Sequence, residues 1–231
     1  MPFEKTMIVA ISGASGAIYA RRILQGLTAG GVRSYVVISP AGRRLLHDEL
    51  GLEQPAVGSI LGPHVVPAEG QIIPLPYSDI GACIASGSLA HQGMVVVPCS
   101  SNKLAQIAHG LSENLISRAA QVTLKERRRL VLVHREMPLG LVELRNMVLA
   151  TEAGAVVCPA SPGFYLNPQS IDDLVDTVAG RVLDFFGIEH TWNTRWLGAG
   201  TRKTGTAAPH PADASRGSHG SSGLADANKP A

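Results

Sequence analysis

The chain has little charge, few aromatic residues and few cysteines. Charged residues make up 16% of its 231 residues, aromatic residues make up 4%, and the formal net charge is only +2. So small a net charge produces only a weak electrostatic field, which argues against nucleic acid as a partner. Cys83, Cys99 and Cys158 are odd in number and widely spaced, which fits neither a disulfide framework nor a Cys-x-x-Cys metal site. We expect them to be small buried side chains in a reducing compartment, and we expect no bound metal.

Long apolar runs are also missing. No stretch is long and apolar enough to span a bilayer, and the amino-terminal MPFEKTMIVAISG has no signal-peptide architecture, because its short apolar run opens onto a glycine turn. We therefore expect a cytoplasmic protein without membrane contact. Hydrophobic residues still reach 45%, which suits a parallel sheet that is buried on both faces. The surplus of apolar surface predicts a homo-oligomer.

Apolar strand-like runs alternate with helical patterns along the chain. The pattern predicts strands over 7–12, 32–39, around 72, 94–98, 130–133 and 155–158, and helices over 17–27, 41–50, 103–109, 114–126, 141–152 and 171–186. This spacing predicts an α/β fold of one domain: a Rossmann-like (flavodoxin-like) three-layer αβα sandwich with a mainly parallel sheet. Residues 1–197 form the predicted domain. Residues 198–231 contain one leucine and no Ile, Val or aromatic residue, so we expect a disordered tail.

Small and hydroxyl-bearing residues follow the first two predicted strands. Ligands of open α/β sheets bind beyond the carboxyl ends of the strands, where SGASGA brings Gly13, Ala14 and Ser15. The motif is Gly-x-x-Gly and not the dinucleotide fingerprint, so alone it is a weak anion signal. The second strand ends at Ser39, where a dinucleotide site would place an acidic residue. A hydroxyl there disfavours NAD and favours a mononucleotide with a terminal phosphate.

Four consecutive polar residues follow the strand at 94–98. Ser100, Ser101, Asn102 and Lys103 exceed what one helix end needs for capping, which favours ligand binding modestly over simple N-capping.

The segment LKERRRLVLVHREMPL gathers seven charged residues among sixteen. Just upstream, Arg118 shares a helix face with Lys125, and the apolar neighbours suggest a helix packed on more than one side. The run 127–129 suits a solvated helix end. Arg135 and Glu136 form either an ordinary salt bridge or a phosphate clamp with an acid beside it, and their spacing leaves the two hypotheses open.

Seven segments together carry a resemblance to a known family. They are GASGA, ASGS, PCSSNKLAQIAHGLSENLISRAA, LKERRRLVLVHREMPL, NMVLATEAGA, PASPGFYLNPQSIDDLV and GRVLDFFGI. In this order, over roughly residues 7–190, the chain closely resembles the UbiX-type flavin prenyltransferases. The departures are Lys103 and His134, where Thr and Pro are common, and Gln121, where an acidic residue is frequent.

The resemblance implies an activity and a set of site residues. The implied reaction joins a dimethylallyl group from dimethylallyl monophosphate to N5 and C6 of reduced FMN, and the prenylated FMN serves a partner decarboxylase. Family members are typically dodecamers with sites between subunits. Carried over by position, the FMN contacts are Gly13, Ala14, Ser15, Ser39, Ser100, Ser101, Asn102, Lys103 and Arg135. The substrate contacts are Arg118, Lys125, Tyr165 and Arg181 for the prenyl phosphate and Trp196 near the prenyl pocket, and the catalytic positions are Ser15, Glu49 and Glu136.

These residue types suit the implied chemistry. Cationic side chains stabilise the charge that develops on a departing phosphate. Glu136 could protonate that phosphate if burial raises the pKa of its carboxyl, and Glu49 relayed through Ser15 could remove a flavin proton. Two alternatives share the predicted fold: an FMN-dependent cysteine decarboxylase, whose Pro-x-Met-Asn motif is absent here, and a non-catalytic FMN carrier or accessory subunit of a decarboxylase.

Overall fold

The computed structural model describes residues 3–53, 57–192 and 194. All described helices and strands belong to the unit Met1–Arg195. Trp196 and the predicted tail over 198–231 lie outside the described residues.

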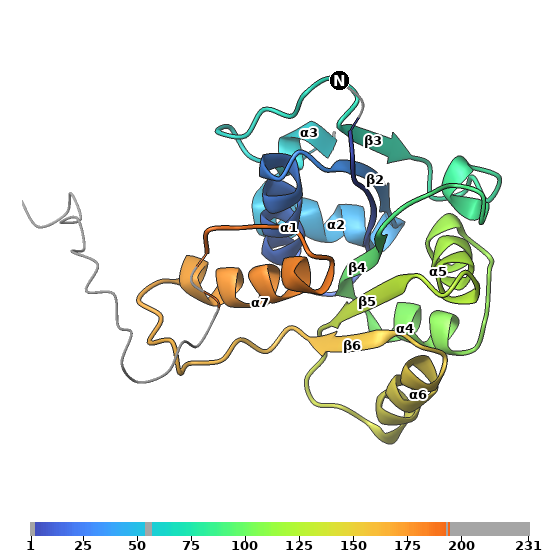
Figure 1. The fold of residues 1–231 in the computed structure, drawn as a ribbon. Coiled ribbons are helices and arrows are strands. Elements are labelled where there is room, and N and C mark those ends of the chain that lie inside the picture. The colour runs from blue at the N-terminus through green and yellow to red at the C-terminus, as the bar shows by residue number, and fades with distance from the viewer. Residues whose placement is uncertain (1–2, 54–56, 193, 195–231) are drawn as a thin grey trace, which may run out of the picture. The chain divides into compact units, whose positions relative to one another are not determined.

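Six strands alternate with helices along this unit (Figure 1). The strands are β1 (Thr6–Ile11), β2 (Arg33–Ile38), β3 (Ile72–Leu75), β4 (Gly93–Cys99), β5 (Arg129–His134) and β6 (Val156–Pro159). The helices are α1 (Ala17–Ala29), α2 (Pro40–Leu50), α3 (Val57–Ile60), α4 (Ser101–Ala108), α5 (Leu115–Lys125), α6 (Leu141–Glu152) and α7 (Ile171–Phe185), with a short 3-10 helix η1 (Cys83–Ala85). The alternation predicted from the sequence is confirmed.

The strands form one parallel sheet in the order β3-β2-β1-β4-β5-β6. This is the Rossmann order, and its switch point lies between β1 and β4. Because the chain leaves β1 and β4 toward opposite faces of the sheet, the loops after these two strands open a crevice between them. The sheet therefore places the residues after β1, β4 and β5 beside one another at its carboxyl edge.

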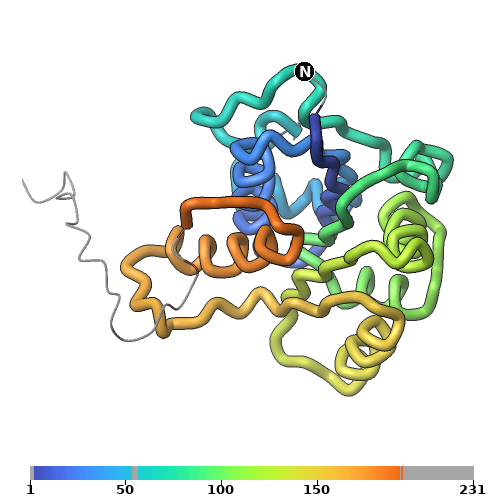
Figure 2. The backbone as a smooth tube through the Cα atoms, viewed as in Figure 1, coloured from blue at the N-terminus to red at the C-terminus, as the bar shows by residue number. Residues whose placement is uncertain are grey.

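Successive strand residues point to opposite faces, and each face has its own core. Val9 and Val95 pack on the side of α1, α2, α3 and α7, whereas Ala10 and Val96 pack on the side of η1, α4, α5 and α6. Figure 2 shows α7 against α1 on one side of the sheet and α4, α5 and α6 on the other. Burial on both faces is why the strands are apolar without alternation.

The differences from the sequence prediction are small and have local causes. The helix α4 begins at Ser101 and not at Lys103, because Ser100 is its N-cap and accepts a hydrogen bond from the Lys103 amide. The one-turn elements α3 and η1 are too short to leave a periodic signal. Of the three cysteines, Cys99 is buried as expected, and burial raises the pKa of its thiol to about 12. The expectation was wrong for Cys83, which is exposed.

Within the described residues, no helix has the length and apolar character needed to cross a membrane.

Candidate active site

The loops after β1, β4 and β5 are joined by hydrogen bonds at the carboxyl edge of the sheet. The Arg135 amide donates to the Cys99 carbonyl at 3.2 Å, and Arg135 Nε donates to the Ser15 carbonyl at 3.2 Å. Arg135 therefore reaches from the end of β5 across β4 to the turn after β1. This brings together two predicted site residues that are 120 positions apart in the chain.

The start of α1 is occupied by a carboxylate from the last turn of α2. Glu49 Oε2 accepts hydrogen bonds from the amides of Gly16 at 2.9 Å and Ala17 at 2.7 Å. A negative charge is stabilised at this end of a helix, so Glu49 takes the position where a phosphate would bind. The glycine turn cannot hold an anion at these two amides while Glu49 remains there.

The preceding part of the turn is open to a ligand. In the described part of the chain, the amides of Gly13, Ala14 and Ser15 donate to no other residue. Gly13 is required sterically, because a Cβ at this position would lie 2.4 Å from the Cβ of Ala41. The turn is thus pressed against the start of α2, while three unpaired donors remain available at its other side.

Two serines beside this turn cap helices. Ser39 is the N-cap of α2, and its buried hydroxyl accepts from the Gly42 amide at 3.0 Å. Ser100 caps α4 in the same way, and its amide donates to Ser12 Oγ at 2.9 Å. Ser12 itself donates to the Pro98 carbonyl at 2.8 Å. Ser12 is not among the predicted site residues, although a hydroxyl at the end of an otherwise apolar strand was a usable signal.

Ser101 lies between the last side chain of β5 and a side chain of the loop that follows. Its hydroxyl donates to Glu136 Oε2 at 3.1 Å and lies 3.3 Å from His134 Nε2. The Met137 amide donates to the other carboxyl oxygen, Glu136 Oε1, at 3.1 Å. These hydrogen bonds, first that from Met137 and then that from Ser101, lower the pKa of Glu136.

This geometry does not meet the condition set for Glu136 as an acid, namely that burial raises the pKa of its carboxyl. The Glu136 side chain is exposed in the single chain, and its pKa moves in the opposite direction. A carboxyl held ionised accepts a proton first, and it can protonate a leaving group only after it has taken one up.

The comparisons with known proteins agree on one family. The model of the Flavoprotein family matches residues 3–183. The flavin prenyltransferase UbiX of Methanothermobacter thermautotrophicus is 44% identical over 198 residues, which are 86% of this chain and 98% of that protein. The chain belongs to the UbiX-type flavin prenyltransferase family. The resemblance inferred from the seven segments is confirmed.

Solved structures of relatives share the fold. The crystal structure of AnUbiX (PadA1) in complex with FMN and dimethylallyl pyrophosphate has a TM-score of 0.72 and 39% identity, over 83% of this chain and 98% of that one. The dodecameric FMN-dependent UbiX-like decarboxylase of Escherichia coli O157:H7 has a TM-score of 0.75 and 37% identity, over 84% of this chain and 100% of that one.

Among the residues that the UbiX-type family predicts to bind FMN, Lys103 stands apart. Its side chain is 3% exposed, and its ammonium lies 2.6 Å from Gln106 Oε1 and 3.0 Å from Asn114 Oδ1. Burial lowers the pKa of Lys103 to about 8. These contacts turn the ammonium toward neutral side chains of the interior, so they do not support a contact between this ammonium and FMN. Asn102, next to it, is exposed at the start of α4.

The residues that the UbiX-type family predicts to hold the prenyl phosphate do not converge within one chain. Arg118 and Lys125 lie on α5, on one face of the sheet, whereas Arg181 lies on α7, on the other. Lys125 ends α5 shortly before β5 begins, so it is at the amino edge of the sheet, about 20 Å from the Arg135 loop by the length of a six-residue strand. Tyr165 is exposed in the segment between β6 and α7. The predicted Trp196 lies outside the described residues.

The arginine run at the other edge of the sheet is not part of this arrangement. Arg128 donates to the carbonyls of Leu89 at 2.6 Å and Gly87 at 2.8 Å, so it anchors a loop, while Arg127 and Arg129 are exposed. The prediction of a solvated run is therefore confirmed for Arg127 and Arg129 and wrong for Arg128.

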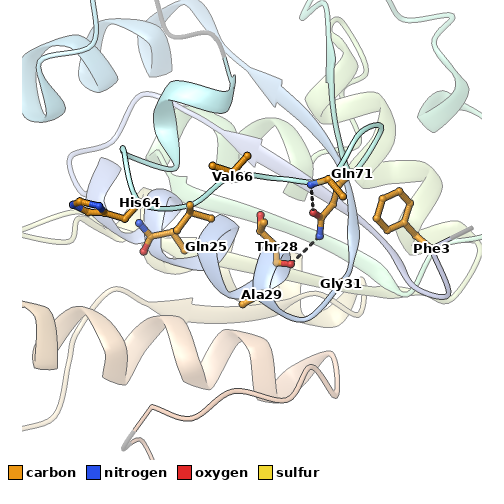
Figure 3. Close-up of a pocket in the computed structure, with 10 residues that line it drawn as sticks. Phe3, Gln25, Thr28, Ala29, Gly31, His64, Val66 and Gln71 are labelled. Carbon is orange, nitrogen blue, oxygen red and sulfur yellow. Dashed lines mark hydrogen bonds between the residues drawn. The ribbon is translucent and has the colours of Figure 1, made fainter. Parts of the chain in front are cut away.

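An open hollow of about 490 Å³ lies between the carboxyl-terminal part of α1 and the segment before β3 (Figure 3). Gln71 closes one side by donating to the Thr28 carbonyl at 2.8 Å and accepting from the Ala68 amide at 2.9 Å. The residues that line this hollow include none of those predicted for the UbiX-type site.

Proposed function

We propose that this chain transfers a dimethylallyl group from dimethylallyl monophosphate to N5 and C6 of reduced FMN. The prenylated FMN then serves as the cofactor of a partner decarboxylase. Family membership supports the activity. The observation that carries the assignment to this site is the hydrogen-bonded junction of the loops after β1, β4 and β5. There Arg135 binds the Ser15 carbonyl, Glu49 binds the Gly16 amide of the same turn, and Glu136 binds Ser101.

The residues at this junction fit a flavin mononucleotide. The turn offers the amides of Gly13, Ala14 and Ser15, and the Ser39 hydroxyl accepts from Gly42 but keeps its own proton to donate. Arg135 uses Nε for the Ser15 carbonyl, which leaves its two terminal nitrogens for an anion. FMN would supply the nucleophilic ring atoms, and the chain supplies the donors that hold it and the carboxylates that take up protons.

A second copy of the chain completes the site in this proposal. Leu141, Val142, Leu144, Val148 and Leu149 are exposed on α6, and they continue the exposed Met137 and Leu139 of the preceding loop. We call these seven residues the α6 patch. A contiguous apolar surface of this kind is typical of an interface. Because the patch begins next to Glu136, a copy bound over it lies beside the site and can bring the cations that one chain keeps apart. A relative of this family is dodecameric.

The function is tested by anaerobic incubation of the protein with reduced FMN and either dimethylallyl monophosphate or the pyrophosphate. The released flavin is then examined by mass spectrometry. A gain of one prenyl unit with the monophosphate supports the proposal, and a gain with the pyrophosphate alone corrects the donor. Unchanged FMN that stays bound favours the carrier hypothesis. Decarboxylation of a peptide ending in cysteine would favour the other alternative.

A further inference from the structure

Three side chains, from the end of β5, the start of α4 and the loop after β5, form a continuous hydrogen-bonded row beside the proposed site. His134 Nε2 lies 3.3 Å from Ser101 Oγ, and Ser101 Oγ lies 3.1 Å from Glu136 Oε2. His134 is 3% exposed, whereas Glu136 is exposed. The row therefore connects a buried imidazole to a carboxyl at the surface of the chain.

The donor inventory fixes the direction of the row. An ionised carboxyl only accepts hydrogen bonds, so Ser101 uses its single hydroxyl proton to donate a hydrogen bond to Glu136. The oxygen of Ser101 then has lone pairs to receive a proton donor, and His134 supplies it as the tautomer that carries hydrogen on Nε2. With the other tautomer, Nε2 would compete with Glu136 for the serine proton.

The surroundings of His134 keep its imidazole neutral near pH 7. Burial is the main cause that lowers the pKa of His134; the charge of Arg135 lowers it further, and the charges of Glu136 and Glu143 oppose this. In the sheet, His134 pairs with Cys99 of β4 and Pro159 of β6, neither of which brings a charge at this pH.

We propose that His134 is a positioning residue for the reaction: by donating to Ser101 it commits the serine proton to Glu136, and so holds that carboxyl ionised and in one orientation. The proposal rests on the proposed function. His134 and Ser101 keep their own protons throughout, and only Glu136 takes up or releases one. The Met137 amide fixes the second carboxyl oxygen, so both oxygens of an otherwise exposed side chain are held.

The first test follows the pH dependence of kcat at saturating FMN. If Glu136 must be ionised, activity is present above its pKa and is lost as pH falls through it. Removing a hydrogen bond that lowers this pKa should move the acid limb of the pH profile, which is the fall of kcat at low pH, to higher pH. We expect a shift of about half a pH unit to one pH unit in His134→Leu and in Ser101→Ala. His134→Gln, which keeps a donor at similar reach, should restore the limb.

Two controls separate this role from a merely structural one. The ring of His109, the C-cap residue of α4, bonds to Asn146 of α6 at 3.0 Å, away from Glu136, so His109→Leu should leave the acid limb of the pH profile unmoved. In a Ser101→Ala background, His134→Leu should cause no further shift, because the connecting hydroxyl is gone. The proposal would be overturned if the acid limb of His134→Leu coincided with that of the wild-type protein. It would also be overturned if His134→Leu still shifted the acid limb in the Ser101→Ala background.

The second test does not depend on turnover. Hydrogen–deuterium exchange at the carbon between the two ring nitrogens, followed by mass spectrometry against pH, reports the ionisation of His134 in the intact protein. Because the charge of Glu136 favours the protonated imidazole, the midpoint of His134 should fall in Glu136→Gln. An unchanged midpoint would refute the connection whether or not prenyl transfer occurs. If the midpoint of His134 falls but the protein prenylates no flavin, the proposed function and the positioning role are both refuted. The result would then support only the hydrogen-bonded connection between His134 and Glu136.

Discussion

The Nζ atom of Lys103 lies 3.0 Å from the Oδ1 atom of Asn114, so the N-cap residue of α5 also binds a buried cation from α4. Gln106 accepts from the same ammonium at 2.6 Å, and the ring of Tyr77 lies 5.4 Å from it. All these partners are neutral, so the ammonium lacks a countercharge among them. Because a buried charge without a countercharge is costly, the protonated form of Lys103 destabilises the folded state.

The buried ammonium of Lys103 predicts that the stability of the folded state rises with pH. The pKa of Lys103 is about 8 in the folded chain and near its ordinary value when unfolded, so the unfolded state binds more protons between these values. The free energy of unfolding should therefore increase as pH rises from about 8 to about 10, by about 3 kcal/mol. Lys103→Met should abolish this rise in urea titrations. The control Lys5→Met removes a lysine that donates to the Gly187 carbonyl at 3.0 Å, and it should keep the rise. An equal rise in Lys103→Met would contradict the prediction.

Glu49 is expected to serve both stability and turnover. Glu49→Ala removes the acceptor for the first amides of α1 and should cost about 1 kcal/mol, or about 3 °C in Tm. Glu49→Gln keeps an oxygen acceptor, so its Tm should fall less. Both variants lose the carboxylate that we propose takes up a proton, so kcat should fall by about 100-fold or more in each. Calorimetry and the prenylation assay check the two effects, and a fully active Glu49→Gln would remove the residue from the proton path.

Glu136→Gln is expected to retain FMN and lose turnover. The amide keeps the shape and can still accept from Met137 and Ser101, but it cannot take up a proton. We expect kcat to fall by about 100-fold with an unchanged flavin Kd. Flavin fluorescence titration and single-turnover mass spectrometry check this, and normal turnover would show that another group moves the proton.

Arg181→Ala should weaken prenyl-phosphate binding more than FMN binding. The guanidinium of Arg181 lies 4.7 Å from the centre of the Phe185 ring and is exposed, so it is available to an anion. Loss of one charged contact should raise the KM for the prenyl phosphate by about 10- to 100-fold. Steady-state kinetics with each substrate varied in turn check this. Equal effects on both substrates would argue against the assignment.

The α6 patch should hold copies of the chain together. Leu144→Asp places a carboxylate within the α6 patch, so the particle mass measured by light scattering should fall. Val66→Asp is the matched control, because Val66 is exposed to 87% at the hollow lined by Gln71. If the copies also complete the site, the Leu144→Asp variant should lose prenyl transfer together with its mass. An unchanged mass in Leu144→Asp would contradict the assignment of this surface.

The sequence by itself determined the layered fold, the family and the local capping. Strands apolar on both faces demand helices on both sides of the sheet, and Ser39, Ser100 and Asn114 cap helices because their oxygens accept from the first free amides. The layers and the caps depend on burial or on neighbours within a few residues, so the sequence pattern reveals them, whereas the family is revealed by the resemblance of the seven segments.

Only the tertiary structure decided what each polar side chain faces. Ser101 meets His134 and Glu136 from 33 and 35 positions away, Glu49 takes the amides at the start of α1, and Lys103 turns into the interior instead of toward a ligand. The pKa shifts of Glu136 and Lys103 follow from these placements, because burial and hydrogen bonding are set by packing across the sheet. The spacing of residues along the chain gives the side of a helix on which a group lies, but not the group that packs against it.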